Sequence, residues 1–231
     1  RAARTRDPVV IEARGAPTAT VIWCHGLGDS PHGWASFCQG MQRDAQLAHV
    51  KFVLPWAPDQ PVTCNGGAIM PSWMDLTQIP LSPTTPDNGK QQAASLSTLH
   101  DLVSGEVASG ISADRIVLGG FSQGAALSLA ASLKCGSKLA GCACLSGWAL
   151  PKQELATTIP SSASKDSGFL ICHGESDRVV EFECGKQVAQ MLESCGIPDL
   201  TFKTYPGLEH SSCNEEETDV MDFLKRVLPP L

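Results

Sequence analysis

The sequence has no long hydrophobic run and no excess of positive charge. No apolar stretch among its 231 residues approaches the roughly 20 residues that a membrane-spanning helix needs. Lys and Arg number 17 against 24 Asp and Glu, which gives a formal net charge of −7. A negative surface argues against nucleic acid as a partner and against electrostatic docking on anionic lipid. We therefore expect no transmembrane segment, no nucleic-acid partner and at most transient contact with a membrane surface.

Metal-ligand spacing is also absent, although the sequence contains 10 cysteines and 6 histidines. There is no C-x-x-C pair and no zinc-ribbon spacing, so we expect no metal and no other cofactor. In strongly apolar runs a cysteine usually serves as a small buried hydrophobe. Four cysteines lie in such runs: Cys24, Cys142, Cys144 and Cys172. This placement favours reduced thiols over a disulfide framework, and it predicts a cytoplasmic location.

Linkers, internal repeats and low-complexity segments are absent too. Hydrophobic residues make up 42% of the chain and charged residues 18%, as in an ordinary globular protein. A chain of this length can bury a full core without disulfides. The sequence therefore predicts one domain that spans residues 1–231.

Short aliphatic or β-branched runs alternate with segments of helical periodicity. The expected strands are Val9–Ile11, Ala19–Cys24, Lys51–Leu54, Arg115–Leu118, Cys142–Leu145, Phe169–Cys172 and Thr201–Tyr205. The expected helices are Gly33–Leu47, Asn88–Ser109, Gln123–Lys134, Glu181–Ser194 and Glu215–Leu228. This alternation predicts an α/β fold with a mostly parallel central sheet and helices on both faces. Ligands bind beyond the carboxyl ends of such strands.

Residues Gly120–Gly124 fit the pattern G-x-S-x-G, with Ser122 at its centre. They follow an expected strand and precede a helix of small residues, which is the context of the nucleophile elbow in α/β-hydrolases. The serine of an elbow lies on a strained turn, and its neighbours must be small to avoid clashes. The alternative is an incidental serine in a glycine-rich turn, which this context disfavours.

A serine hydroxyl is a weak nucleophile, so it needs a base that is held by a carboxylate. α/β-Hydrolases supply these groups in the order serine, acid, histidine. Asp177 and His210 each come just after an expected strand, in the required order. Glu175 and, more weakly, Glu209 are competing carboxylates. The sequence favours Asp177 and His210 as the partners of Ser122.

The other five histidines have structural interpretations. His25 and His173 each precede a glycine at the end of an expected strand, where a histidine typically hydrogen-bonds backbone. His32, His49 and His100 occupy ordinary surface or helix positions. A metal site built from His25, His173 and nearby cysteines is the alternative, but no ligand spacing supports it.

Acyl transfer also requires hydrogen-bond donors that face the developing oxyanion. One is the backbone N–H of the residue after the nucleophile, here Gln123, and the other comes from the loop after an early strand. The segment His25–Asp29 occupies that place, and its glycines allow an amide to turn inward. We expect Leu27 to supply the second donor. A glycine turn without a catalytic role is the alternative.

One stretch interrupts the alternation of strands and helices. Residues Pro55–Pro86 contain seven prolines, no clear helix and a short candidate strand near Ala68–Met74. Their aromatic and aliphatic content argues against disorder, and a loop of this length is usually functional. Its prolines limit the entropy lost on ordering, so we expect it to hold a fixed shape beside the active site, as one wall of a groove. The same apolar rim is able to pair two copies into a weak homodimer that hides the groove.

These motifs together resemble the acyl-protein thioesterase and lysophospholipase/carboxylesterase family of α/β-hydrolases. The resemblance covers nearly the whole chain, through His25–Asp29, Pro61–Thr63, Met70–Asp75, Gly119–Gly124, Leu145–Trp148, His173–Gly174 with Asp177, and His210–Ser212. It implies hydrolysis of S-palmitoyl groups on protein cysteines, or of lysophospholipids and small esters. The family's nucleophile, acid and base fall on Ser122, Asp177 and His210. Its oxyanion donors fall on Leu27 and Gln123.

The resemblance also implies an acyl channel between the proline-rich loop and the tryptophan that follows the Leu-Ser-Gly strand. The family's channel residues match Trp73, Leu76, Trp148 and Val179. Met74 stands where the family usually has an aromatic residue, and the segment Asp75–Asn88 diverges most. Both departures affect the part of the chain that would set acyl length.

Two other classes of function remain open at this point. A general carboxylesterase for small esters would use the same triad and would differ only in the length and mouth of its channel. A non-catalytic binding module would retain the fold without the reaction. The intact Ser–Asp–His set and both oxyanion positions count against the binding module.

Overall fold

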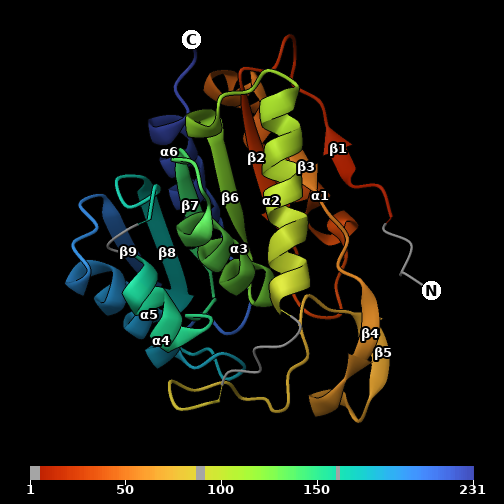
Figure 1. Ribbon diagram of the computed structural model, residues 1–231, viewed down its shortest axis with the longest axis vertical. Coiled ribbons are helices and arrows are strands. Elements are labelled where there is room, and N and C mark those ends of the chain that lie inside the picture. Colours follow the sequence, from red (N-terminus) through yellow and green to blue (C-terminus); the bar gives the residue numbers. More distant parts are fainter. Residues whose placement is uncertain (1–5, 87–91, 160–161) are drawn as a thin grey trace.

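The computed structural model describes residues 6–86, 92–159 and 162–231. Its centre is a seven-stranded sheet in the order β1-β3-β2-β6-β7-β8-β9 (Figure 1). Only β1 is antiparallel to its neighbour in this sheet. The strands are β1 (Val9–Ile11), β2 (Ala19–Cys24), β3 (Val50–Leu54), β6 (Ile116–Phe121), β7 (Gly141–Leu145), β8 (Gly168–Gly174) and β9 (Leu200–Tyr205). All seven strands expected from the sequence are therefore present.

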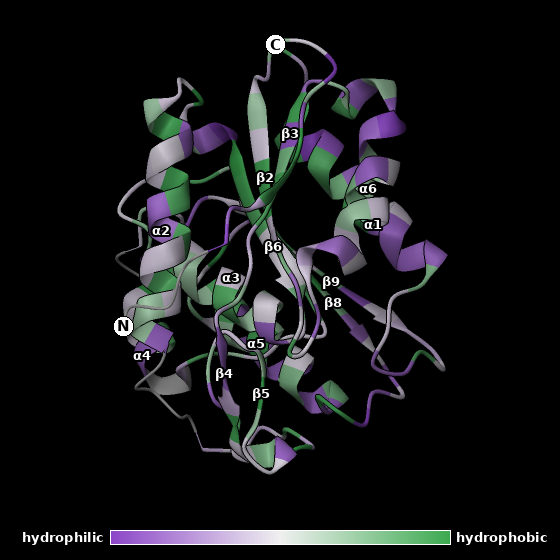
Figure 2. Ribbon diagram, turned by 90° about the vertical axis from the view of Figure 1, so that its right-hand side faces the viewer, coloured by the Kyte–Doolittle hydropathy of each residue, from purple (hydrophilic) through white to green (hydrophobic). Residues whose placement is uncertain are grey.

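The α-helices in the described residues are α1 (Pro31–Arg43), α2 (Gln92–Ala108), α3 (Gln123–Lys134), α4 (Lys152–Thr158), α5 (Phe182–Ser194) and α6 (Asn214–Val227). In the described residues, short 3-10 turns lie at η1 (Ala45–Leu47), η2 (Thr63–Asn65) and η3 (Ala113–Arg115). The helices cover both faces of the sheet (Figure 2). The chain thus has the α/β-hydrolase fold that the sequence predicted.

Alternate residues of a strand point to opposite faces of a sheet, and β2 shows how this divides the core. Val21 and Trp23 pack in one apolar cluster with residues of α1 and α6. Ile22 and Cys24 pack in another with residues of α2 and α3. Because both faces are covered, the central parallel strands β2, β6, β7 and β8 are almost entirely buried, whereas the edge strand β9 is partly exposed.

Several boundaries and two elements differ from the expectations. The first helix ends at Arg43 instead of Leu47, because Asp44 is extended and its side chain accepts a hydrogen bond from Gln46 N–H. The expected start of the second helix, Asn88, lies outside the described residues. The short helix α4 was not predicted.

The proline-rich stretch contains a hairpin of two strands, β4 (Asp59–Val62) and β5 (Ala68–Pro71). The sequence indicated only the second of them. The prolines at Pro61 and Pro71 concealed the hairpin, since a proline removes a backbone donor and is tolerated only at an edge. A separate two-stranded sheet consists of edges alone, so it can include both.

Within the described ranges, no helix combines the length and the apolar character needed to cross a bilayer. All ten cysteines are in the thiol form.

Helix α6 carries a buried carboxyl group. Glu216 is 0% exposed, and neither of its side-chain oxygens has a hydrogen-bond partner in the described part of the chain. Burial, with smaller contributions from the charges of Glu217 and Asp219, raises the pKa of Glu216 to about 8. The folded protein therefore keeps a proton at pH 7 that the unfolded chain releases near pH 4.5. Stability is lost as the pH rises between these two values.

We predict that Glu216→Gln stabilises the protein in alkaline solution, because an amide cannot ionise. Each unit of pKa shift corresponds to about 1.4 kcal/mol, so the variant should melt at least about 4 °C above the wild type at pH 8 and close to it at pH 5. Glu215→Gln, at an exposed position on the same helix, is the control and should leave the pH dependence unchanged. A lower melting temperature for Glu216→Gln at pH 8 would refute this account.

Candidate active site

Ser122 lies on a strained turn between β6 and α3. Its φ of 55° and ψ of −120° fall outside the regions that non-glycine residues ordinarily occupy. A Cβ atom at Gly120 or at Gly124 would overlap the carbonyl oxygen of Cys24 at the end of β2. The two glycines of the motif are therefore required by close packing against β2. This is the geometry of a nucleophile elbow.

Three side chains from the ends of separate strands meet beyond the carboxyl edge of the sheet. His210 Nε2 lies 2.9 Å from Ser122 Oγ, and His210 Nδ1 lies 2.7 Å from Asp177 Oδ2. Ser122 follows β6, Asp177 follows β8 and His210 follows β9. The structure thus brings together the three residues that the sequence selected, in the arrangement of a serine, its base and an orienting acid.

The two competing carboxylates do not reach His210. Glu175 is exposed and accepts a hydrogen bond from Thr204 Oγ1 at 2.8 Å. Glu209 is also exposed, although it is the sequence neighbour of His210. Asp177 is therefore the carboxylate that contacts the imidazole.

Asp177 is ionised although its side chain is 0% exposed. Burial alone would raise its pKa. The hydrogen bond and charge of His210, together with the N–H groups of Val179 and Val180, outweigh burial and hold the pKa of Asp177 below its ordinary value. Both N–H groups donate to Oδ1 at 2.9 Å. Because Oδ1 is held in this way, Oδ2 is left to face His210.

His173 supports the loop that carries Asp177. Its Nε2 lies 2.9 Å from the carbonyl oxygen of Val180 and 3.5 Å from Asp177 Oδ2. Burial lowers the pKa of His173, so the ring is neutral and its Nε2–H donates to Val180. This agrees with the structural role expected for His173.

The loop after β2 lies directly beside the nucleophile. A Cβ added to Gly26 would stand 3.5 Å from Ser122 Cβ, which is ordinary van der Waals contact, so the two residues lie side by side. Gly28 has a φ of 74°, and its N–H donates to Pro71 O at 2.8 Å. Leu27, between these glycines, lines the same groove as Ser122. This places Leu27 where the sequence expects an oxyanion donor.

A groove of about 280 Å³ begins at the serine and runs under the proline-rich loop. Besides Ser122 and His210, its apolar walls include Leu27, Leu76, Ile79, Leu81, Val179 and Val180. The expected acyl-binding residues Leu76 and Val179 are therefore part of it.

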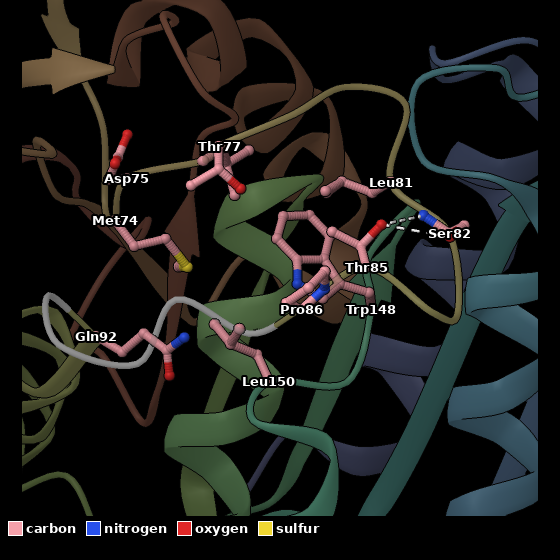
Figure 3. Close-up of a pocket in the computed structure, with 11 residues that line it drawn as sticks. Met74, Asp75, Thr77, Leu81, Ser82, Thr85, Pro86, Gln92, Trp148 and Leu150 are labelled. Atoms are coloured by element: carbon pink, nitrogen blue, oxygen red, sulfur yellow. Dashed lines mark hydrogen bonds between the residues drawn. The ribbon is translucent and has the colours of Figure 1, made fainter. Parts of the chain in front are cut away.

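A second, nearly filled pocket of about 20 Å³ adjoins the groove and shares Leu76 and Leu81 with it. Trp148 lines this pocket, and Figure 3 shows its ring with Met74, Leu81 and Leu150 around it. Leu76 and Leu81 thus stand between the open groove and Trp148.

Trp73 differs from the expectation of an acyl contact. It is 1% exposed and lines neither the groove nor the adjoining pocket in the described residues. Its indole Nε1–H donates to the carbonyl oxygen of His25 at 2.9 Å, and its ring lies 5.3 Å from the His25 ring. The structure therefore places Trp73 behind the loop after β2 instead of in the groove.

Another groove, of about 460 Å³, is also lined by His210. It shares Asp29, Phe121 and His210 with the apolar groove, and its aromatic lining includes Trp34 and Phe37. The Phe121 ring is 4.7 Å from the His210 ring. The two grooves therefore meet at His210 and Phe121.

Two contacts of the site had not been predicted. The Gln123 side chain is buried and hydrogen-bonded to the backbone of Trp73 and Met74, although the sequence indicated a role only for its backbone N–H. Asp29 accepts a hydrogen bond from the Trp34 indole at 3.1 Å. A long amide side chain at the start of a helix of small residues was the only sequence signal for the first contact.

No group of three or more His, Cys, Asp or Glu side chains in the described ranges is arranged to hold a metal ion.

The strained serine turn and the fold that presents it define an α/β-hydrolase. Residues 5–228 match the phospholipase/carboxylesterase family, and the chain therefore belongs to that family and is a hydrolase. The acyl-protein thioesterase 1 of Gibberella zeae is 43% identical over 227 residues, which cover 96% of each chain. The acyl-protein thioesterase 1 of Neurospora crassa is 41% identical over 228 residues, which cover 97% of this chain and 93% of the relative.

Solved structures of plant proteins resemble this one over nearly their whole length. Arabidopsis thaliana SOBER1 has a TM-score of 0.85 at 34% identity, and the match covers 91% of this chain and 99% of that chain. Zea mays acyl-protein thioesterase 2 has a TM-score of 0.83 at 30% identity, with 96% of this chain and 98% of that chain covered.

The geometry predicts different outcomes at the two candidate acids. Asp177→Asn should lower kcat by about 10³–10⁴, because an amide disturbs the histidine tautomer and no longer stabilises the imidazolium. Glu175→Gln is the matched control, and it should retain kcat within about threefold. Initial rates on a p-nitrophenyl ester would compare the two. A larger loss at Glu175 would show that the wrong carboxylate was selected.

Proposed function

We propose that the protein hydrolyses acyl thioesters, above all S-palmitoyl and other S-acyl groups on protein cysteines, with Ser122 as the nucleophile. Lysophospholipids and other acyl esters would be further substrates. The observation that carries the proposal is the hydrogen-bonded series Asp177–His210–Ser122 at the mouth of an apolar groove. The names of relatives such as acyl-protein thioesterase 1 support the choice of substrate.

In the first half of the reaction, His210 Nε2 takes the proton of Ser122 Oγ as the oxygen attacks the acyl carbonyl carbon. Asp177 stabilises the imidazolium that forms. The backbone N–H groups of Leu27 and Gln123 donate to the oxyanion of the tetrahedral intermediate. The carbon–sulfur bond then breaks, and the leaving thiolate takes the proton from His210.

In the second half, a water molecule attacks the acyl-enzyme. His210 again accepts the proton, and the same two N–H groups again stabilise the oxyanion. Collapse of this intermediate returns the proton to Ser122 Oγ and releases the fatty acid. The enzyme ends the cycle in its starting state.

The two grooves beside His210 suit the two parts of an acylated protein. The apolar groove under the proline-rich loop would take the acyl chain, since each buried methylene contributes about 0.8 kcal/mol. The groove lined by Trp34 and Phe37 would take the polypeptide around the leaving cysteine, because the leaving group must lie near His210 to receive its proton.

A small-ester carboxylesterase is the second candidate function, and one observation favours it. The pocket next to Trp148 has only about 20 Å³ of free space. A long chain would have to displace Leu76 or Leu81 to enter it, whereas a short acyl group would fit in the groove as it stands. Initial rates on acyl thioesters and oxygen esters of increasing length would decide between the two functions.

Two expectations from the sequence are retained as proposals. A weak homodimer or a transient membrane contact would use apolar side chains near the groove, and support comes from Ile79 at its edge, which is 42% exposed. A cytoplasmic location is supported by the ten free thiols.

We predict that Ser122→Ala leaves a folded protein with almost no hydrolysis, with kcat reduced by about 10⁴–10⁶. The same variant should lose labelling by a fluorophosphonate probe, which reacts with activated serines. Its melting temperature should stay near that of the wild type. If the variant kept more than a few per cent of the activity, Ser122 would not be the nucleophile.

The double variant Leu76→Ser, Ile79→Ser should separate short from long substrates. We expect most of the activity on an acetyl ester to survive, while kcat/KM on an octanoyl or longer thioester falls at least tenfold, because the polar side chains weaken burial of the chain. Ile69→Ser is the control, since this residue is 73% exposed and lines neither cavity in the described residues.

Two results of this experiment would contradict an acyl role for the loop. Equal losses on both substrates would mean that the loop supports the catalytic geometry. No loss on either substrate would mean that the acyl chain binds elsewhere.

A further inference from the structure

All the polar groups of Trp73 form hydrogen bonds, although Trp73 lines neither the apolar groove nor the adjoining pocket in the described residues. Its backbone N–H donates to Gln123 Oε1 at 2.7 Å, and its carbonyl oxygen accepts from Ser95 Oγ. Its indole N–H donates to the carbonyl oxygen of His25 at 2.9 Å. These bonds join the starts of α2 and α3 to the loop that follows β2.

His25 extends this hydrogen-bonded network along the loop after β2. Its Nδ1 lies 2.7 Å from the carbonyl oxygen of Gly26, and its Nε2 accepts the N–H of Ala57 at 3.2 Å. Because Nε2 is an acceptor, the ring carries its proton on Nδ1 and donates it to Gly26. Burial lowers the pKa of His25, which keeps the ring in this neutral form.

Because the peptide bond is planar, these contacts also fix the direction of the neighbouring N–H groups. The C=O and N–H of one trans peptide point in opposite directions. A fixed carbonyl at Gly26 therefore fixes the direction of the Leu27 N–H. A fixed carbonyl at His25 does the same for the preceding peptide. The Trp73 indole and the His25 ring thus hold the two successive peptide planes that lead to Leu27.

The Gln123 side chain connects Trp73 to the second donor. The side chain is fully buried, accepts from Trp73 N–H and donates from Nε2 to the Met74 carbonyl oxygen at 2.8 Å. The backbone N–H of the same residue is the other proposed oxyanion donor. Trp73 therefore lies between the two donors and is bonded on both sides.

We propose that Trp73 is a positioning residue of the oxyanion hole. Through His25 and the Gln123 side chain, it keeps the N–H groups of Leu27 and Gln123 at the separation that a tetrahedral intermediate requires. This inference rests on the proposed function, and it assigns Trp73 to transition-state binding in place of the acyl contact expected from the sequence. Donors act only when they lie about 2.7–3.1 Å from the oxyanion, so a small shift of the loop weakens catalysis.

The test compares two tryptophans that differ in one hydrogen bond. Trp73→Phe keeps an aromatic ring but removes the donor to His25. Trp23→Phe is the matched control, since Trp23 is also 1% exposed and its indole nitrogen has no partner in the described part of the chain. Each variant is assayed on an acetyl ester and on an octanoyl thioester. Binding is measured for an octyl trifluoromethyl ketone, which forms an oxyanion on the enzyme, and for octanoate, which does not.

For Trp73→Phe we expect kcat to fall at least tenfold on both substrates while KM changes less than threefold. Affinity for the trifluoromethyl ketone should fall in parallel with kcat/KM, and affinity for octanoate should stay within threefold. Trp23→Phe should retain kcat within threefold. If Trp73 had a purely structural role, Trp73→Phe would lower the affinity for the ketone and for octanoate to the same extent.

Gln123→Met supplies a second arm that does not depend on Trp73→Phe folding. It keeps the backbone donor but removes the hydrogen bonds that the amide makes with Ser72, Trp73 and Met74. We again expect weaker binding of the ketone and unchanged binding of octanoate. The double variant should lose less than the product of the single losses, because both changes release the same segment.

Three outcomes would overturn the inference. In one, Trp73→Phe keeps kcat within twofold. In another, it raises only KM, and only for the octanoyl substrate, as an acyl contact would. In the third, it lowers the affinity for the ketone and for octanoate equally. Failure of the proposed function is recognised separately, because the wild type would then hydrolyse no acyl thioester or would not be labelled at Ser122 by a fluorophosphonate.

Discussion

The site depends on the close packing of the Ser122 turn against the end of β2. Gly120 and Gly124 let this turn approach the Cys24 carbonyl more closely than any side chain would permit. The same approach brings the loop at Gly26 beside the serine. One steric constraint therefore places the nucleophile and the loop with the first proposed oxyanion donor next to each other, on two adjacent strands of a rigid sheet.

The buried polar groups around the serine are kept in defined charge states. Asp177 remains ionised because His210 and two N–H groups compensate for its burial. For His25 and His173, burial outweighs the nearby carbonyl and carboxylate groups and lowers the pKa, so both rings are neutral and hold backbone carbonyls. Glu216 keeps its proton for the same reason. Burial thus favours neutral groups. Asp177, whose charge the proposed mechanism needs, stays ionised because His210 and two N–H groups stabilise the carboxylate.

Much of this arrangement could be predicted from local patterns. The strands follow from short aliphatic runs, and the order Ser122, Asp177, His210 at strand ends was enough to select three side chains that hydrogen bonds join in the structure. The hairpin β4–β5 was only partly predicted, because its prolines are typical of an irregular loop. Trp73 was expected to face the acyl chain because it matches a channel residue of the family that the sequence resembles.

The sequence by itself determined the fold class, the order of the elements and the strand ends at which the chemistry is placed, because hydrophobic periodicity and glycine spacing are local properties of the chain. The tertiary structure alone decided which contact each side chain makes. Asp177 and Glu175 are two residues apart, and only the direction of their loop sends one to His210 and the other to Thr204. Trp73 lies behind the loop after β2, where its backbone N–H bonds Gln123, 50 residues later in the chain, and its indole N–H bonds His25, 48 residues earlier.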